Sequence, residues 1–464
     1  MVDLREPLDS LIALPARFTS QTRFPRAAEI RLYDTTLRDG EQTPGVAFTP
    51  EQKYELAVML SEAGLHMLDV GFPSAALSER RSLGLILEGK RKGTIRPDVE
   101  IVVMCRSSHH DIDATVDILR DLGARPNDCS FFLFTSGSDL HLKYKLGKTL
   151  LQREGRKPEE WLDLPVSFYR DANIRMSCDA IAHARSRGVE TIEFGGEDGS
   201  RADVQYLIDL AGACYGAGGS RYAFPDTVGF FAPEGVDYYI PKIVAAFPDK
   251  PLVIHFHNDF GLGAYNTVRA LHHGATIPTC TVNGIGERAG NAPLHTTVMI
   301  LKELYGITIP GFRYDMLWAL RRKVEELSGL PVGATEPIIG HNVFTHETGI
   351  HTAGITIHPA IYQVVEPEAV GGELRFLFGK HSGAVAIEAI LARHKDELAQ
   401  DGVLITPRLV QLLVRVVKEL REDRALVSHH ADGIRDYYAH LDRLGLGEHD
   451  LLSYARVLGR PERG

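Results

Sequence analysis

The chain has 464 residues, of which 44% are hydrophobic and 24% charged, so it can bury a large core, and its length predicts two or three folded units. Its formal net charge is -10, and its lysines and arginines are spread along the chain without a basic block. These features argue against a nucleic-acid partner and favour a small-molecule substrate.

The sequence begins MVDLREPLDSLIALPARF, which has acidic residues and only a short apolar stretch, broken by Pro15, unlike a secretory signal. No apolar run approaches the roughly 20 residues that cross a bilayer, so no membrane partner is expected. Five cysteines are present without CxxC spacing, namely Cys105, Cys129, Cys178, Cys214 and Cys280. Such cysteines are typical of reduced thiols, so we expect a cytoplasmic protein.

Residues 1–28 are expected to form an N-terminal extension, and residues 29–305 then alternate short apolar runs with amphipathic stretches. This alternation predicts βα units around a parallel sheet, with helices at, for example, residues 51–62 and 111–122. Eight apolar runs can be counted, namely IRLYDT, HMLDVGF, VEIVVMC, CSFFLF, VETIEF, SRYAFP, LVIHFH and ATIPTCTV. Eight repeats favour an α/β fold of the (β/α)8 TIM-barrel class, whose catalytic groups lie at the C-terminal ends of the strands.

The longest stretch between predicted elements, residues 135–164, is polar and rich in lysine, so we expect a functional or mobile loop there. After Tyr305 the periodicity changes. Residues 306–383 are expected to form a linker and lid subdomain with two histidine-rich motifs, and residues 384–464 a helical C-terminal subdomain. The helical spacing is clearest at Leu409, Val410, Leu412, Leu413, Val416, Val417 and Leu420.

Polar side chains gather where the predicted strands end. In chain order they are Asp34, Arg38, Asp39, Asp69, Glu197, Thr227, His255, His257 and Asn291. Because a barrel brings the C-terminal ends of its strands to one face, we expect these side chains to lie around one site.

His255 and His257 stand two residues apart on a predicted strand, which projects both imidazoles from the same face. An isolated HxH more often holds one buried and one surface histidine. Here Asp39, beside Arg38 and Gly40 in the first loop, can complete a site of two histidines and one carboxylate with open positions for a substrate. Such ligands suit Zn, Mn, Mg or Co, so we expect a divalent metal.

The motifs DTTLRDGEQ, HFHNDFG, GIGERAGN and HETGIH, in this order, resemble those of the 2-isopropylmalate synthase and homocitrate synthase family. The resemblance covers roughly residues 29–383. It implies an acyltransferase in which the enolate of acetyl-CoA attacks a metal-bound 2-oxo acid, and the resulting thioester is hydrolysed to a 2-alkylmalate-type acid.

The resemblance also implies roles for single residues. Asp39, His255 and His257 would hold the metal, with Asn291 as a nearby or weaker ligand. Arg38 would stabilise negative charge on the developing oxyanion. Thr227 matches the residue that binds the substrate carboxylate, although simple loop packing would also explain it, and Glu197 matches the active-site acid.

A weak carbon acid such as the acetyl methyl group needs a positioned base. By resemblance this base is His351 of HETGIH, reaching over the barrel of a partner subunit in a homodimer, with His346 beside it; capping or packing is the plain alternative. In homocitrate synthases a glutamate orients this histidine, and the matching residue here is the shorter Asp69.

GERAGN, which contains Gly286 and Gly290, follows the last predicted strand, where barrels commonly bind phosphate groups through backbone amides. We expect it to help the pantetheine arm of acetyl-CoA approach. FGKHSG, residues 378–383, also resembles the family but suggests no chemical role.

Three residues bear on the 2-oxo acid. Synthases that use 2-oxoglutarate carry an arginine where this chain has Glu193, so repulsion should exclude that dicarboxylate. Gly195 and Gly196 replace larger residues of the family and should enlarge the pocket for an acid at least as large as 2-oxoisovalerate, aromatic ones included. Alternatively, the two glycines do not enlarge the pocket and only give the backbone more freedom at the end of the strand.

Other classes stay open at this stage. The same barrel and metal ligands serve lyases and aldolases such as HMG-CoA lyase, which HETGIH and FGKHSG disfavour, and a homocitrate synthase is a further alternative. A non-catalytic binding module would leave the metal ligands unexplained. The chain ends before the leucine-binding domain of long family members, so leucine inhibition is not expected.

Overall fold

The computed structural model describes residues 19, 22–378, 382–422, 433 and 436. They form two compact units. The first comprises residues 15–313 and 320–328, and the second comprises residues 314–319 and the part of the chain from residue 329 onward.

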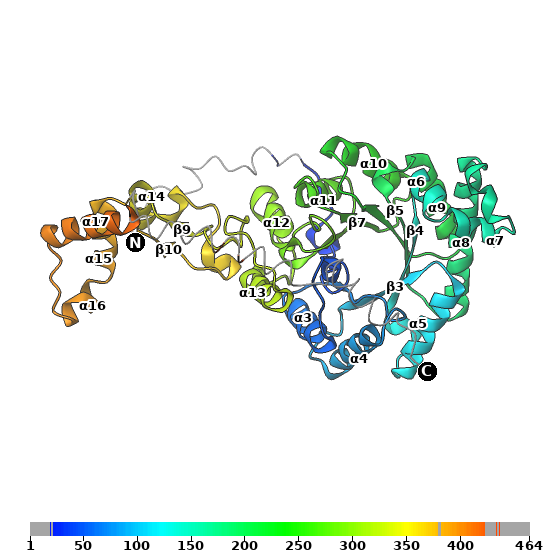
Figure 1. The fold of residues 1–464 in the computed structure, drawn as a ribbon, viewed down its shortest axis with the longest axis horizontal. Helices are drawn as coiled ribbons and strands as arrows, with labels where there is room; N and C mark the ends of the chain where they lie inside the picture. Colours follow the sequence, from blue (N-terminus) through cyan, green and yellow to red (C-terminus); the bar gives the residue numbers. More distant parts are fainter. Residues whose placement is uncertain (1–18, 20–21, 379–381, 423–432, 434–435, 437–464) are drawn as a thin grey trace, which may run out of the picture. The chain divides into compact units, whose positions relative to one another are not determined.

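The first unit is built on a closed barrel of eight parallel strands in the order β1 to β8, which confirms the predicted (β/α)8 fold (Figure 1). The barrel closes where Tyr33 pairs with Thr279. The strands are β1 (Tyr33–Asp34), β2 (Met67–Asp69), β3 (Glu100–Arg106), β4 (Ser130–Ser136), β5 (Ile192–Glu197), β6 (Arg221–Asp226), β7 (Leu252–Phe256) and β8 (Ile277–Cys280).

Helices surround these strands and bury the outer faces of the sheet (Figure 1). They are α3 (Pro50–Glu62), α4 (Leu77–Lys92), α5 (His109–Asp121), α6 (Asp139–Tyr144), α7 (Gly147–Arg153), α8 (Val166–Ser186), α9 (Val204–Gly216), α10 (Pro233–Ala246), α11 (Gly263–His272), α12 (Leu294–Met299) and the last residues of α13 (Leu317–Ser328). Both sides of the strands are therefore covered, which explains why the strand runs read as almost continuously apolar.

Inside the barrel, inward-facing residues of six strands form a packed layer. Its members are Tyr33, Met67, Val102, Ala223, Val253 and Ile277, with Phe132 packed against them. Each of Ala223, Val253 and Ile277 stands two residues before a residue that lines the site described below, so the layer forms the floor of the site.

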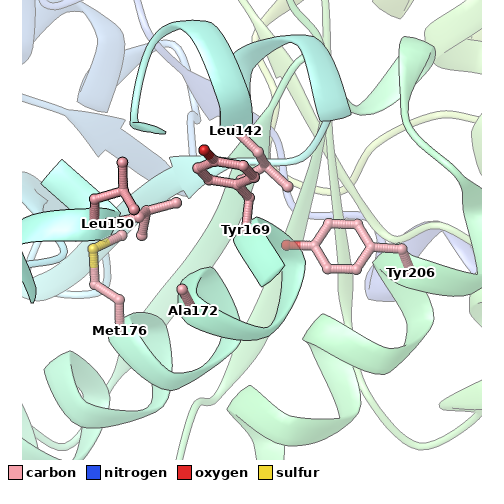
Figure 2. Packing of buried hydrophobic residues seen from close by; sticks show 7 residues of the cluster. Leu142, Leu150, Tyr169, Ala172, Met176 and Tyr206 are labelled. Carbon is pink, nitrogen blue, oxygen red and sulfur yellow. The ribbon is translucent and has the colours of Figure 1, made fainter. Parts of the chain in front are cut away.

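The lysine-rich segment 135–164 is not the loop that its composition predicts. It contains α6, α7 and a 3-10 turn at Pro158–Leu162. Leu142, Leu150 and Leu151 are fully buried against Tyr169 and Ala172 of α8 (Figure 2). The prediction was wrong because each of the two short helices buries leucine side chains against α8, although the average composition of the segment is polar.

The second unit holds α14 (Gly349–Ile357), α15 (Ala384–Arg393), α16 (Lys395–Gln400), α17 (Pro407–Glu422) and two short parallel strands, β9 (Thr345–His346) and β10 (Arg375–Phe376). The helical pattern expected after residue 384 is confirmed as far as Glu422. Most of the predicted N-terminal extension, residues 379–381 of FGKHSG and nearly all of 423–464 lie outside the described residues. Within the described part of the chain, no helix is long and apolar enough to cross a membrane.

Candidate active site

A cavity of about 390 Å³ opens at the C-terminal ends of the barrel strands. Among the residues singled out from the sequence, its lining includes Arg38, Asp39, Glu193, Gly195, Glu197, Thr227, His255 and His257. Five further residues singled out from the sequence are not part of this lining, namely Asp69, Gly196, Gly286, Gly290 and Asn291. The expected clustering of polar groups at one barrel face is therefore present.

A tight turn after β1 brings Arg38 and Asp39 into the barrel. The carbonyl of Thr35 accepts hydrogen bonds from the backbone N–H groups of Arg38, Asp39 and Gly40 at 3.2, 2.8 and 3.1 Å. The carboxylate of Asp34 accepts from the backbone N–H of Thr36 at 2.9 Å, which fixes the start of the turn. Asp34 therefore shapes the loop, and Arg38 and Asp39 face the cavity.

Asp39, His255 and His257 form a compact three-ligand group. One ligand atom from each lies within 4.8 Å of the others. Nε2 of His255 is 3.0 Å, and Nε2 of His257 is 3.9 Å, from Oδ2 of Asp39. This is the spacing of donors that can converge on one divalent cation.

The electrostatics of the group suit a cation. Burial lowers the pKa of His257 to about 4, and the nearby His255 lowers it further. The imidazole of His257 is therefore neutral at pH 7 and free to donate a lone pair. Burial opposes ionisation of Asp39, but Arg38 and the two histidines hold the pKa of its carboxyl below the ordinary range. A neutral imidazole beside an ionised carboxylate is the protonation state that metal binding requires.

Two further polar atoms support this interpretation. The Oδ1 atom of Asn291 is buried and has no hydrogen-bond partner in the described part of the chain, while its Nδ2 donates to the carbonyl of Ile285 at 3.3 Å. Asn291 forms a backbone bridge with His257. An unpaired buried oxygen costs free energy unless a ligand uses it, so Oδ1 of Asn291 is available to a ligand beside His257. Nδ1 of His255 lies 2.9 Å from Oγ1 of Thr279, which orients that imidazole.

Arg38 is held by two carboxylates. Its Nε donates to Asp69 at 2.7 Å and its Nη1 donates to Asp39 at 3.0 Å. Burial raises the pKa of Asp69, and the Arg38 charge opposes that rise. Asp69 is fully buried and orients Arg38 instead of facing the cavity.

Glu197 and Thr227 stand at the cavity wall with different neighbours. Glu197 ends β5 and forms an ion pair with Lys145, the residue after α6. The hydroxyl of Thr227 accepts from the backbone N–H of Asp198 at 2.8 Å, and its carbonyl accepts from Nη2 of Arg288 at 2.7 Å. Thr227 thus combines a packing role with a position on the cavity lining.

Glu193 lies deeper in the barrel. It is 1% exposed and accepts from Nε of Arg221 at 2.6 Å. Nη1 of Arg221 is 2.7 Å from Glu100, which also pairs with Arg31 at 2.8 Å. Burial raises the pKa of Glu193, and Arg221 opposes that rise.

The two glycines of β5 point in opposite directions. Gly195 lines the cavity, and a Cβ built on it would meet the carbonyl oxygen of Ala223 at 2.5 Å, so β6 approaches too closely for any side chain. Gly196 faces away from the cavity, and a Cβ there would meet Gly137 N at 2.8 Å. Close backbone approach therefore accounts for both glycines, and only Gly195 borders the substrate space.

The GERAGN loop is shaped by Asn291 and by its own backbone. A Cβ on Gly286 would meet Nδ2 of Asn291 at 2.2 Å, and one on Gly290 would meet the carbonyl oxygen of Gly284 at 1.8 Å. The N–H of Gly290 donates to the carbonyl of Glu287 at 2.9 Å. Glu287 and Arg288 of this loop reach the cavity.

His346 and His351 belong to the second unit, and their ring centroids are 6.2 Å apart. His346 is buried on β9, where burial lowers its pKa. His351 is exposed on α14 and stacks on Tyr362 at 4.1 Å between ring centroids.

Several residues of the site escaped the sequence analysis. Phe72, Met104, Phe132 and Phe134 form an apolar wall, with Phe72 and Phe134 edge-to-face at 5.5 Å between centroids. Inward alternation along β3, β4 and β8 is the signal that would have indicated Met104, the phenylalanines of β4 and Thr279. Nothing in the sequence indicates that Lys145 pairs with Glu197.

A barrel with a two-histidine, one-carboxylate group at the C-terminal ends of its strands defines a class of metal-competent enzymes. Residues 29–157 and 162–324 match the family described as HMGL-like, and residues 338–424 match the region described as homocitrate synthase post-HMGL domain-like. The chain belongs to the HMGL-like family.

Curated relatives share most of the chain's length. The chain is 36% identical over 409 residues to the probable 2-isopropylmalate synthase of Ignicoccus hospitalis, covering 85% of this chain and 94% of that one. It is 35% identical over 401 residues to the homocitrate synthase AksA of Methanopyrus kandleri, covering 86% and 90%. It is 36% identical over 393 residues to the putative (R)-citramalate synthase CimA of the same organism, covering 84% and 69%. The relatives are synthases, and the protein is an enzyme.

Solved structures agree on the fold. The chain matches the Bacillus subtilis HMG-CoA lyase with a TM-score of 0.50 and 20% identity, covering 67% of this chain and 96% of that one. At this identity the match supports the barrel architecture and carries no information on the reaction.

Proposed function

We propose that the protein condenses acetyl-CoA with the ketone carbon of a 2-oxo acid and then hydrolyses the thioester, as a synthase of the 2-alkylmalate type. The observation that carries the proposal is the group of Asp39, His255 and His257 beside Arg38 in one cavity. The names of the curated relatives, which are 2-isopropylmalate, citramalate and homocitrate synthases, support the same reaction.

The proposed reaction has two stages, a condensation and a hydrolysis. A base removes a proton from the acetyl methyl group, and that carbon forms a bond with the ketone carbon, whose oxygen takes up a proton and becomes a hydroxyl. Water then breaks the C–S bond of the thioester and leaves a carboxylate and free CoA. A divalent ion, when bound, would polarise the ketone as a Lewis acid.

The protein's own side chains have defined parts in this scheme. Arg38, held by Asp69, donates toward the oxygen on which negative charge develops. Asp39, His255, His257 and Asn291 would hold the cation. His351 is proposed as the base on the strength of the HETGIH motif, acting at the barrel of a partner subunit in a homodimer.

We propose a bulky, uncharged side chain for the 2-oxo acid. The wall formed by Phe72, Met104, Phe132 and Phe134 is apolar and mostly aromatic, and flat rings pack well in such an environment. A cavity of about 390 Å³ falls in the range of small-molecule sites. Glu193 on the lining disfavours a second carboxylate in the substrate.

A CoA-release assay tests the function. The purified enzyme, supplied with a divalent metal and acetyl-CoA, is offered pyruvate, 2-oxoisovalerate, 4-methyl-2-oxopentanoate, phenylpyruvate and 2-oxoglutarate, with product masses measured. We expect CoA release only with a 2-oxo acid, fastest with a bulky apolar one. CoA formed with no 2-oxo acid present, or none formed with any acid, would contradict the proposal; pyruvate outperforming every bulkier acid would overturn the substrate class alone.

A further inference from the structure

Arg288 of the GERAGN loop connects the loops that follow three neighbouring strands. Its Nε and Nη2 donate to the two carboxylate oxygens of Asp259, in the loop after β7, at 2.8 and 2.9 Å. Its Nη2 also donates to the backbone carbonyl of Thr227, in the loop after β6, at 2.7 Å. Because Arg288 itself follows β8, one guanidinium on the cavity lining joins the C-terminal ends of three strands.

The backbone of Arg288 adopts a conformation that residues with side chains rarely take. Its φ angle is 56°, in the left-handed region. Main-chain hydrogen bonds hold the turn around it, because the N–H of Gly290 donates to the carbonyl of Glu287 at 2.9 Å and the carbonyl of Gly290 accepts from the N–H of Asn258 at 2.9 Å. Strained backbone persists only where surrounding contacts fix it, and it is most frequent at functional sites. The turn therefore supports a defined placement of the Arg288 side chain.

The contacts of Thr227 leave its hydroxyl proton available to a ligand. The carbonyl of Thr227 accepts from Arg288, and its Oγ1 accepts from the backbone N–H of Asp198 at 2.8 Å. A threonine hydroxyl can accept and donate at the same time. Within the described part of the chain, no group accepts its proton. Since Thr227 lines the cavity, a substrate carboxylate bound there would supply the missing acceptor.

We propose that Arg288 is a positioning residue for the 2-oxo acid, because it holds the main chain of Thr227 in the place from which the hydroxyl donates to the substrate carboxylate. This inference rests on the proposed function. Asp259 completes the arrangement, since it binds the guanidinium and also lies against the turn that contains Thr227. A Cβ built on Gly229 of that turn would meet Oδ2 of Asp259 at 2.6 Å, so no side chain separates the two.

Arg288 contributes position more than charge. The carboxylate of Asp259 offsets the guanidinium charge through a bidentate contact, which leaves little net attraction for a distant anion. Donors are needed for Asp259 and Thr227 at once, and the planar guanidinium supplies both in a fixed geometry. A lysine ammonium keeps the charge without this geometry, so Arg288→Lys separates the two effects.

The test is the Kd of a 2-oxo acid for the metal-loaded enzyme without acetyl-CoA, measured by isothermal titration calorimetry. The probe is the acid of the panel above that gives the fastest CoA release. Arg288→Met should raise this Kd at least about tenfold, the size expected for one hydrogen bond to a carboxylate, while the KM for acetyl-CoA and the bound metal stay within about twofold of wild type. Arg288→Lys should behave more like Arg288→Met than like the wild type. Arg80→Met, at an exposed pair with Asp121, is the matched control and should leave the Kd unchanged.

A double-mutant cycle with Thr227→Val tests whether Arg288 acts through the threonine. In the Thr227→Val background, which lacks the hydroxyl, Arg288→Met should raise the Kd by no more than about twofold. A rise of about tenfold that persists there would overturn the inference, as would an unchanged Kd in folded Arg288→Met protein or a wild-type Kd in Arg288→Lys protein. If Arg288→Met does not fold, Arg288→Lys takes its place in the cycle. If the wild type releases no CoA with any acid, the proposed function fails instead, so the two failures are distinct.

Discussion

Asp69 is fully buried at the end of β2, and its carboxylate accepts a 2.7 Å hydrogen bond from Nε of Arg38. This contact and the bond from Nη1 to Asp39 hold the guanidinium on the cavity lining. The sequence suggested that Asp69 orients His351. In the structure Asp69 instead orients Arg38 of the same barrel.

Replacing Asp69 by Asn should therefore impair chemistry more than metal binding. The amide keeps the shape but loses the charge that holds Arg38, and we expect kcat to fall about 10- to 100-fold with little change in bound metal. Steady-state kinetics with metal analysis checks this. Asp121→Asn, at an exposed pair with Arg80, is the control. An unchanged kcat in a folded Asp69→Asn protein would remove the positioning role.

Metal removal should abolish turnover. Chelation should stop CoA release, and re-addition of Zn, Mn, Mg or Co should restore it, because Asp39, His255 and His257 lie close enough together to share one divalent cation. His255→Ala should purify with metal content near zero by elemental analysis. Full activity after exhaustive chelation, with no metal detected, would contradict this prediction.

Thr279 should tune the affinity for the metal. Its hydroxyl lies 2.9 Å from Nδ1 of His255, and losing such a supporting contact typically weakens metal binding about 10- to 100-fold. Thr279→Val keeps the volume and removes the contact. Competition with a fluorescent chelator measures the change, and Thr297→Val, a buried threonine that does not line the cavity, provides the comparison. Equal affinities in the two variants would rule out the orienting contact.

His351 should act in turnover and not in metal binding. His351→Gln is expected to lower kcat about 10²- to 10⁴-fold, the usual cost of losing a positioned general base, with metal content preserved. If the base serves a partner's barrel, mixing inactive His351→Gln and His255→Ala proteins should regain part of the activity. Near-normal turnover of His351→Gln would return the role to His346 or to another residue.

Lys53 should be a major stabilising residue. It is 1% exposed on α3 and pairs with Glu41 at 2.6 Å and Glu79 at 2.5 Å, tying the loop after β1 to α4. Lys53→Met leaves both carboxylates without their cation, and breaking a buried pair in this way costs about 3–5 kcal/mol. Urea unfolding measures the loss. Lys92→Met, at an exposed pair with Glu88, should unfold at the wild-type urea concentration.

The sequence by itself determined the barrel and indicated a group of three residues that could hold a metal ion. Eight apolar runs favour this fold because closing the sheet removes the two unpaired edge strands that an open parallel sheet would leave. Asp39, His255 and His257 could be named because chemistry in barrels follows strand ends, and the strand ends were visible in the sequence.

Tertiary structure decided the partners of these groups. Three contacts join residues from different βα units, namely the hydrogen bond from Arg38 to Asp69 and the ion pairs of Lys145 with Glu197 and of Arg221 with Glu193. Their distances depend on barrel closure and on the register between strands, neither of which leaves a local pattern. The same holds for segment 135–164, whose leucines form a core only once α8 supplies Tyr169 and Ala172 to pack against.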